Sequence, residues 1–311
     1  MASSTSSARS LRAAARQHPL PAEAFGRRVE ALAGELEPAL DGEPKAVHQA
    51  RVATRRLREI LPVALDTTSG RGARLRRRLK RLTRALGPVR ELDVACGLLT
   101  DRSGGRPEPG VVALRAHLSE RRLAALDVLH RACDAGRARR LLKRLSARVE
   151  ALAQDGRGAA PPRRERRRLA RRVVDRACAL AAAVDASGAM LIVDRVHAVR
   201  IAAKRLRYAL ELAGELALAK TQVFVARLKT TQDILGSLHD LDVLRIEAAR
   251  VHASLPPESI VARDLDRIVA ALDGDVRQLH ARYLRGARAL AALTDRVQDR
   301  MAPCLDSSIS T

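Results

Sequence analysis

Aromatic side chains and asparagine are almost absent from this sequence. Its 311 residues include two Phe, two Tyr, no Trp and no Asn. Strand-favouring residues are therefore scarce, whereas Ala, Leu and Val supply most apolar side chains, which predicts an all-α fold and excludes a β-sandwich or barrel. Proteins that bind single-stranded nucleic acids stack bases on aromatic rings, and Asn commonly reads adenine, so both absences weigh against a protein that reads bases.

Catalytic motifs are missing as well. The sequence contains no P-loop, nucleophile elbow, dinucleotide fingerprint or cluster of metal ligands. The cysteines form no C-x-x-C pair, which argues against a zinc site or a disulfide framework and favours a reducing, cytoplasmic setting; they are Cys96, Cys133, Cys178 and Cys304. We therefore expect a protein that is not an enzyme and that uses no metal and no cofactor.

The sequence also lacks a long apolar run. The longest weakly charged stretch, from Ala177 to Val193, contains Asp185 and is too short to cross a bilayer, so we expect no membrane span. Residues 1–20 are rich in Ser and Arg and lack the apolar core of a secretory signal. Their composition resembles that of an organelle transit peptide, but we predict a disordered tail there and a second one over 299–311.

Basic residues are what the sequence has in excess. There are 58 Lys and Arg against 35 Asp and Glu, which gives a formal charge of +23, and all but six of the basic residues are Arg. Because Arg presents a planar fork of donors that matches phosphate oxygens, a polyanion is the natural ligand. The alternative is a coding bias toward Arg and Ala that leaves a solvated basic surface.

Helical periodicity runs through the chain, with one marked interruption at QDGRGAAPPRRE. We predict a first helical bundle over 21–155 and a second over 156–298. The helices expected in the first are 21–40, 44–65, 73–86, 88–100, 110–133 and 136–154. Those expected in the second are 163–186, 191–216, 220–235, 237–253, 257–273 and 278–298.

An internal repeat relates the two halves. VHQARVATRRLREIL at 47–61 matches VHAVRIAAKRLRYAL at 196–210 in eight of fifteen positions, and LKRLTRALGPVRELDV at 79–94 matches LKTTQDILGSLHDLDV at 228–243 in seven of sixteen. Both pairs have the same offset of 149 residues. The sequence therefore predicts a duplicated helical unit whose copies pack about a pseudo-two-fold axis.

Each copy of the first motif places its basic residues on one helical face. At about 100° per residue, one histidine and three cations share a face about 80° wide, opposite the apolar positions Ala50, Ala53, Leu57 and Leu61. These basic residues are His48, Arg51, Arg55 and Arg58 in the first copy and His197, Arg200, Lys204 and Arg207 in the second. Arg56 and Arg205 lie at the border, whereas Leu206 and Leu210 are expected to pack inward.

The helix that follows each motif should return antiparallel and add further cations. Taking the turn near Ser69 and Gly70 as the point of return places Lys80 level with Arg58, and Arg84 near Arg55. The same reasoning places Lys229 level with Arg207. The first copy is the more basic of the two in this region, so we expect two half-sites that are not equivalent.

These residues resemble the CHAD domain, the conserved histidine α-helical domain. The resemblance is carried by H-x-x-R-V-x-x-R-R-L-R at 48–58, H-x-x-R-x-x-x-K-R-L-R-Y at 197–208 and two L-G-x-x-x-[ED]-L-D-V segments, and it extends over about 22–298. It implies two helical bundles related by a pseudo-two-fold axis, around a basic cavity or groove that binds inorganic polyphosphate. No E-x-E-x-K motif of a fused triphosphate-hydrolysing domain occurs, so we expect a stand-alone domain, cytoplasmic and targeted to polyphosphate granules.

The resemblance and the helical faces together give one predicted polyphosphate-binding set. It combines the basic positions of both motifs with cations of the returning helices. The set comprises His48, Arg51, Arg55, Arg56, Arg58, Lys80, Arg84, His197, Arg200, Lys204, Arg205, Arg207 and Lys229.

The histidines and the carboxylates of the second motif leave several roles open. Each histidine could contact phosphate, shuttle a proton or become phosphorylated. Alternatively, it could form an orienting hydrogen bond with a carboxylate, Asp93 for His48 and Asp242 for His197. We favour ligand contact or structural support over catalysis. Two carboxylates in each copy, Glu91 with Asp93 and Asp240 with Asp242, could suggest magnesium. Carboxylates two residues apart on a helix do not share a face, so we expect them to pair with Arg.

Three other functions remain in competition with polyphosphate binding. An Arg-rich groove attracts any phosphate backbone, so nucleic-acid backbone binding is the main alternative, expected to be weaker and purely electrostatic. A phosphate-metabolism enzyme that uses His48 and His197 is the second, and a granule-associated scaffold is the third.

Overall fold

The described part of the molecule is built from helices. A computed structural model describes residues 21–65, 67–68, 70–104, 108–155 and 163–306, and within these ranges it contains helices and no strand, which confirms the predicted all-α fold. In chain order the helices are α2 (Pro21–Leu40), α3 (Pro44–Ala64), α4 (Gly70–Ser103), α5 (Pro109–Ala132), α6 (Ala135–Asp155), α7 (Arg163–Ser187), α8 (Val193–Glu215), α9 (Gln222–His252) and α10 (Ile260–Asp306). The predicted tail at 1–20, residues 307–311 of the tail predicted over 299–311, and 156–162 at the predicted junction lie outside the described residues.

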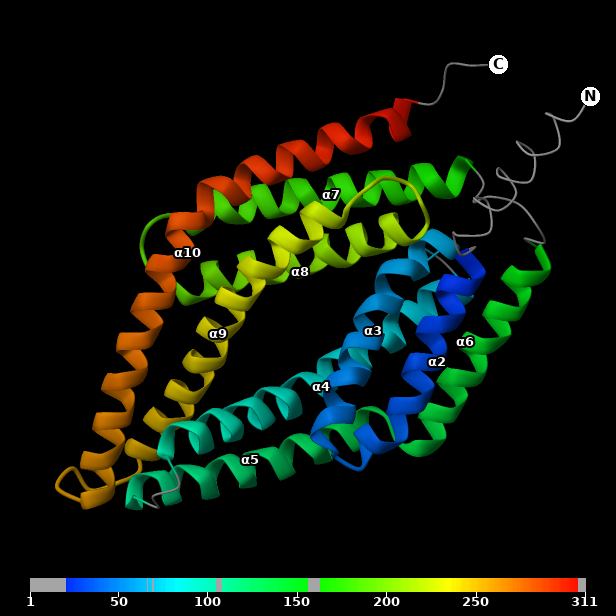
Figure 1. Cartoon of the computed structure of the whole chain (residues 1–311). Helices are drawn as coiled ribbons and strands as arrows, with labels where there is room; N and C mark the ends of the chain where they lie inside the picture. The colour runs from blue at the N-terminus through cyan, green and yellow to red at the C-terminus, as the bar shows by residue number, and fades with distance from the viewer. Residues whose placement is uncertain (1–20, 66, 69, 105–107, 156–162, 307–311) are drawn as a thin grey trace, which may run out of the picture.

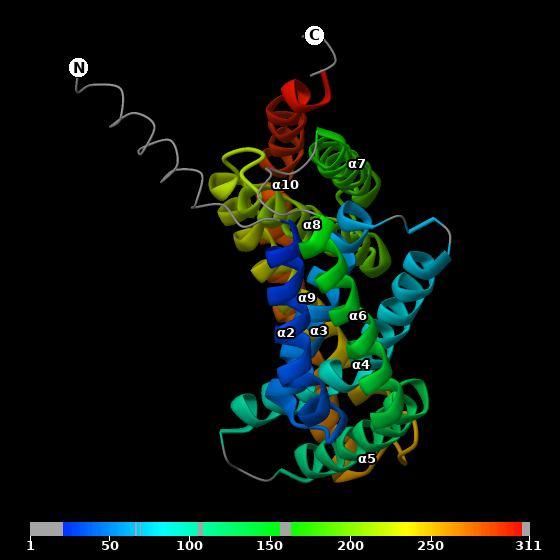
Figure 2. The same cartoon turned by 90° about the vertical axis from the view of Figure 1, so that its right-hand side faces the viewer.

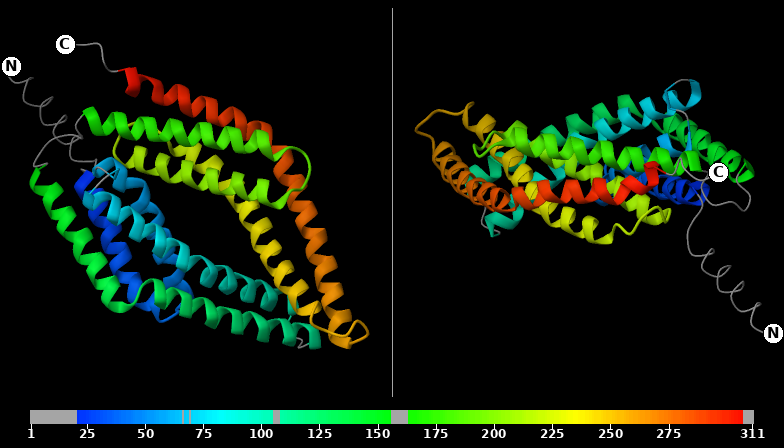
Figure 3. Two further views of the ribbon diagram at one scale, coloured as in Figure 1. Left: turned by 180° about the vertical axis from the view of Figure 1, so that it is seen from behind. Right: turned by 90° about the horizontal axis from the view of Figure 1, so that it is seen from above.

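The chain arranges these helices as two neighbouring groups. In Figure 1 the first half, α2 to α6, occupies the lower right, and the second half, α7 to α10, occupies the upper left. Within the first half α2 packs between α3 and α6, and α4 packs on α5; within the second half α10 packs on both α7 and α9. The view from behind in Figure 3 shows the same two groups, with the long α10 bending along the outer edge.

The helices that carry the repeated motifs meet where the two halves join. The first motif lies on α3 and the second on α8, and these two helices contact each other, as do α4 and α9. The order of elements thus follows the sequence repeat, in that α3 pairs with α4 and α8 pairs with α9. The origin of this arrangement in a duplication remains a prediction from the repeat itself.

The apolar faces of the motif helices are buried as predicted. Ala50, Ala53, Leu57 and Leu61 belong to one hydrophobic core that continues through both halves, and so do Leu206 and Leu210. Burying a leucine side chain stabilises a fold by about 1.5–3 kcal/mol, so this shared apolar seam holds the motif helices in place. Their basic faces are thereby directed away from the core.

Three of the predicted helix breaks are wrong. Single helices α4, α9 and α10 replace the pairs 73–86 with 88–100, 220–235 with 237–253, and 257–273 with 278–298. Gly87 and Pro88 were expected to end a helix, yet α4 continues because Leu86 and Val89, on either side of them, are both completely buried. Tertiary packing of an apolar face outweighs a local breaker of this kind.

The predicted end at Gln298 is also wrong, because α10 continues to Asp306. Val297 and Met301, just before and after that end, are completely buried and extend the core contact of this helix. No helix in the described ranges combines the length and the apolar character that crossing a membrane requires.

Candidate anion-binding site

A basic cavity lies where α3, α4 and α8 meet. It has a volume of about 380 Å³, and its walls contain eight of the predicted cations. These are Arg51, Arg55 and Arg58 of α3, Lys80 and Arg84 of α4, and Arg200, Lys204 and Arg205 of α8. The prediction that Lys80 and Arg84 lie near the cations of α3 is therefore confirmed.

Four further residues line this basic cavity, and sequence reasoning did not include them. They are Glu59, Thr83, Ile201 and Tyr208. Thr83 follows Lys80 by three residues and so shares its helical face, and Tyr208 directly follows the second motif's cations. Both could have been found from helical spacing alone.

The single carboxylate of the cavity wall is already neutralised from outside. Glu59 is buried, and it accepts a hydrogen bond from Arg172 (Nε to Oε2, 2.8 Å) and pairs with Arg176 (Nη2 to Oε1, 3.5 Å) on α7. Two other acids lie behind the wall at longer range, Glu91 at 3.4 Å from Arg51 and Asp240 at 3.7 Å from Arg200. The cavity itself is consequently left with excess positive charge.

The crowding of cations lowers their pKa values. Burial, followed by the charges of Arg200, Arg55 and Arg51, lowers the pKa of Lys204 to about 7. Burial and the neighbouring Arg55 lower the pKa of Arg51 to about 10. Each shift means that the charged form is less stable here than in water, and an anion placed among these groups would reverse that effect.

One arginine of the wall has a buried donor with nothing to bind. Arg200 is 7% exposed, and its Nε lies buried without a hydrogen-bond partner among the described residues. Buried polar atoms almost always have partners, so an orphaned donor at a cavity wall points to a missing acceptor. A phosphate oxygen is an acceptor of the required kind.

Gly87 makes room for one of these arginines. A Cβ atom at this position would lie 2.5 Å from Nη1 of Arg51. The glycine that looked like a helix break in the sequence therefore allows the Arg51 guanidinium to lie against the α4 backbone. At Gly236, the matching position of the second motif, a Cβ would meet nothing within 4 Å.

Five predicted binding residues do not line the cavity. Lys229 is exposed on α9, a helix that contributes nothing to the described walls, so its inclusion in the binding set is not supported by this cavity. Arg207 instead donates to Oε1 of Gln232 (2.7 Å) and Oε1 of Glu211 (2.6 Å), and lies 4.8 Å from the centre of the Tyr208 ring. The second half thus supplies one helix to the cavity and the first half two. This agrees with the expectation that the two half-sites are not equivalent.

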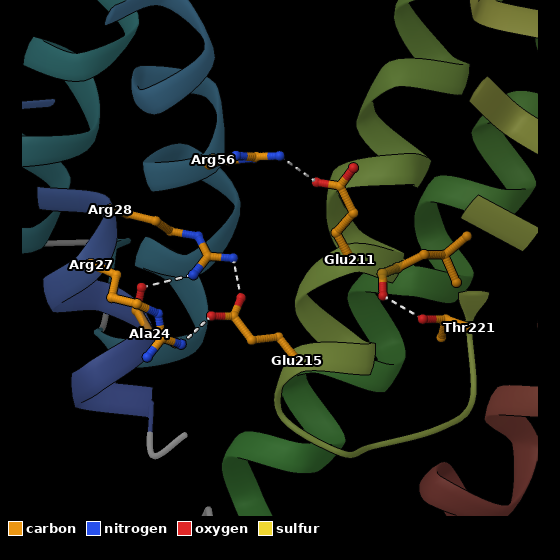
Figure 4. Close-up of polar contacts among 8 residues, drawn as sticks. Ala24, Arg27, Arg28, Arg56, Glu211, Glu215 and Thr221 are labelled. Carbon is orange, nitrogen blue, oxygen red and sulfur yellow. Dashed lines mark hydrogen bonds and ion pairs between the residues drawn. The ribbon is translucent and has the colours of Figure 1, made fainter. Parts of the chain in front are cut away.

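Arg56 faces a different hollow, at the outer side of the junction. It pairs with Glu211 there, while Arg27 and Arg28 of α2 both bind Glu215 (Figure 4). Glu215 is the last residue of α8, where a negative charge opposes the helix dipole, so the two guanidinium groups offset an unfavourable position. These contacts join α2 and α3 to α8 and hold the two halves together beside the basic cavity.

The histidines also lie off the cavity wall, and their predicted carboxylate partners are wrong. Oδ1 of Asp93 accepts from Arg122 on α5 (2.6 Å), and Oδ1 of Asp242 accepts from Arg245 (2.7 Å). Because Asp93 lies two residues beyond Glu91, it faces the opposite side of α4, toward α5 and away from α3. The expectation that all four motif carboxylates pair with Arg is confirmed.

Burial and nearby cations act on both motif histidines. Burial and then the charge of Arg90 lower the pKa of His48, and burial and then His239 lower the pKa of His197. Nδ1 of His197 lies 3.3 Å from Nδ1 of His239. Both imidazoles are therefore mainly neutral at pH 7. Within the described ranges, no group of three or more His, Cys, Asp or Glu is placed to hold a metal ion.

Comparison with known proteins agrees with this architecture. The crystal structure of the CHAD domain from the plant Ricinus communis is 24% identical, with a TM-score of 0.55, over 92% of this chain and 93% of that one. PptA from Streptomyces chartreusis is 18% identical, with a TM-score of 0.57, over 89% and 98%. At these identities the two similarities show the fold alone. No curated protein matches the chain. The sequence model of the CHAD domain matches residues 23–249, most of the chain, and the protein therefore belongs to the CHAD domain family.

Proposed function

We propose that this protein binds inorganic polyphosphate in the basic cavity between α3, α4 and α8. The observation that carries the proposal is a cavity of about 380 Å³ whose walls hold eight cations and one carboxylate, the carboxylate being paired with arginines of α7. Six of these eight cations are Arg, which binds phosphate oxygens through two parallel donors.

The shape of the cavity favours a narrow polyanion over a nucleic acid. A duplex is wider than a cavity of this volume can admit, and a single strand carries bases that need a surface to stack on. Tyr208 is the one aromatic residue among the described walls; it is 6% exposed, and Arg207 lies against its ring. A chain of phosphates without bases meets neither obstacle, and its charge density matches that of the walls.

The proposed role is binding without chemical change. The described walls contain no Ser, Cys, Asp or His to act as nucleophile or base, and Glu59 is held by Arg172 and Arg176. His48 and His197 lie off the walls and are neutral, so they support the surrounding helices. We further propose that the protein acts in the cytoplasm and, by holding polyphosphate, associates with polyphosphate granules.

A competition titration tests this function. Long-chain polyphosphate should displace mixed-sequence duplex DNA at equal phosphate concentration, and log affinity should fall with log salt by several units, since each neutralised phosphate releases just under one counterion by analogy with nucleic acids. Changing Arg55 and Lys204 together to Gln should flatten that slope. The matched control changes Lys220 and Arg288, both exposed and outside the cavity wall, to Gln.

Two results would overturn the proposal. Equal or tighter binding of DNA would make nucleic-acid backbone binding the better description. Steady release of phosphate from polyphosphate or a nucleotide by the pure protein, lost in His48→Ala or His197→Ala, would show that the protein is an enzyme.

A further inference from the structure

A second basic depression lies between α4 and α6, outside the cavity. Two adjoining hollows of about 240 and 500 Å³ share Arg78, and both are lined by these two helices, which lie side by side in Figure 2; Ala132 and Cys133 at the end of α5 complete the smaller one. We call them together the α4–α6 groove. Its main cations are Arg74, Arg78 and Arg81 of α4 and Arg140, Arg144 and Arg148 of α6. The spacings of three and four residues put each set on one helical face.

The charge of this groove is not balanced by nearby acids. No Asp or Glu occurs between Gly70 and Arg90, or between Ala135 and Val149. None of the six arginines forms an ion pair with a described residue, and Arg137, at one end of the groove, is the neighbour that does, with Asp134 at 3.3 Å. At the contact of α4 with α5, by contrast, Arg122 has a carboxylate partner in Asp93.

Arg78, at the centre of the groove, shows the effect of this crowding. Its pKa is lowered by burial and then by the charges of Arg144, Arg81, Arg140 and Arg74, with no carboxylate among the causes. Side chains on two helices therefore direct like charges at one point. This arrangement costs folding free energy unless an anion occupies it.

The groove is continuous with the basic cavity across α4. Lys80 and Arg84 line the cavity, and Arg81, the next residue after Lys80, lines the groove. Arg77 is exposed on the same helix, and around the helix axis its direction lies between those of Lys80 and Arg81. The distance to be crossed is about one helix diameter, roughly 10 Å. A flexible polyanion that leaves the cavity over α4 thus meets cations along the whole way.

The lining of the groove favours a ligand made of phosphate alone. Between the arginines it contains Leu75, Leu82, Leu141, Ala147 and similar small or aliphatic residues, and no aromatic side chain. Bases would find nothing to stack on, and no side-chain amide is present to read them. Charge and shape therefore select a bare chain of phosphates.

We propose that the α4–α6 groove is a second polyphosphate-binding site, which takes the part of a long polyphosphate that emerges from the cavity across α4. The inference rests on the proposed function, and it gives that function a dependence on chain length. Tripolyphosphate is too short to occupy both sites at once, whereas a long chain gains affinity because its second contact is intramolecular.

The test compares three variants, of which the groove and control variants each remove three arginines, in titrations with tripolyphosphate and with long-chain polyphosphate. The groove variant changes Arg74, Arg78 and Arg144 to Gln, and the cavity variant changes Arg55 and Lys204 to Gln. A control variant changes Arg288, Arg296 and Arg300 to Gln; these are exposed on α10, which belongs to the other half of the molecule (Figure 1). Thermal melting of each variant verifies that it is folded.

Relative to the control, the groove variant should bind the long chain about tenfold or more weakly, and its salt slope should fall by about two to three units, close to one for each cation removed. Its loss for tripolyphosphate should be smaller. If groove and control variants bind the long chain alike while the cavity variant is weakened, the groove proposal is wrong and the proposed function stands. If the wild type binds no polyphosphate, both fail. If DNA and not polyphosphate loses affinity in the groove variant, the groove binds nucleic acid and the proposal is overturned.

Discussion

Replacing Lys204 by Met should stabilise the folded protein, and the gain should depend on pH. The ammonium group lies in the cavity beside Arg200, Arg55 and Arg51, and burial together with these charges lowers its pKa from 10.5 to about 7. One pKa unit corresponds to about 1.4 kcal/mol, so keeping this lysine in the folded state costs about 4 kcal/mol at pH 7. Met has a similar length and no charge, and it removes this cost.

The sign of the pH dependence follows from proton binding. Between pH 7 and pH 10.5 the unfolded chain keeps the Lys204 proton and the folded chain has largely lost it. Because the unfolded state binds more protons, the stability of the wild type rises with pH in this window. About 2 kcal/mol of the cost disappears between pH 7 and pH 9, so the advantage of Lys204→Met should shrink by that amount.

Urea denaturation followed by circular dichroism at pH 7 and pH 9 measures both quantities. Lys220→Met, an exposed lysine in the turn before α9, is the matched control and should leave the difference between the two pH values unchanged. An advantage of Lys204→Met that is equal at pH 7 and pH 9 would refute the reasoning, because it would show that Lys204 keeps its proton throughout.

Three further outcomes are expected. Arg58→Glu should weaken polyphosphate binding about tenfold or more, because it places an anion in the cavity wall, whereas His48→Ala should change it by less than about threefold; a binding titration with thermal melting compares them. Gly87→Ala should weaken tripolyphosphate binding by displacing Arg51, while Gly236→Ala, with open space at the same motif position, should leave binding intact and raise stability by roughly 0.5–1 kcal/mol. Binding at pH 8 should take up close to one proton, since an anion restores the charge of Lys204; calorimetry in buffers of different ionisation enthalpy measures it, and the uptake should vanish in Lys204→Met.

The cavity could be predicted from the sequence where local spacing decides the geometry. Arg51, Arg55 and Arg58 recur at intervals of three and four residues, which fixes one helical face whatever surrounds it. Because few residues separate α3 from α4 in the sequence, α4 must run back along α3, and this brings Lys80 and Arg84 beside the cations of α3. Both steps use only the helical period and the direction of the chain.

The remaining errors concern contacts between parts distant in sequence. Arg56 differs from Arg55 by one residue, yet it faces Glu211 because of the way α8 docks on α3, and no local pattern encodes that docking. Lys229 was included in the binding set because it was expected level with Arg207, but no residue of α9 lines the cavity, and the sequence does not show which helices form its walls. Gly87 was predicted to end a helix because the sequence does not show that the side chain of Arg51, on α3, packs against this position.

The placement of carboxylates separates the structural arginines from the proposed binding arginines. At the junction of the halves, Glu211 faces Arg56 and Glu215 faces Arg27 and Arg28, so the outer contacts join opposite charges. Inside the cavity the cations of α3 and α8 face each other, and Glu59, the one carboxylate of the described wall, is already paired with arginines of α7. Attraction between opposite charges therefore stabilises the outer side of the junction, whereas repulsion between the cations of α3 and α8 destabilises its inner side. A polyanion in the cavity contacts cations of both halves and converts that repulsion into attraction, so binding must also tighten the contact between α3 and α8.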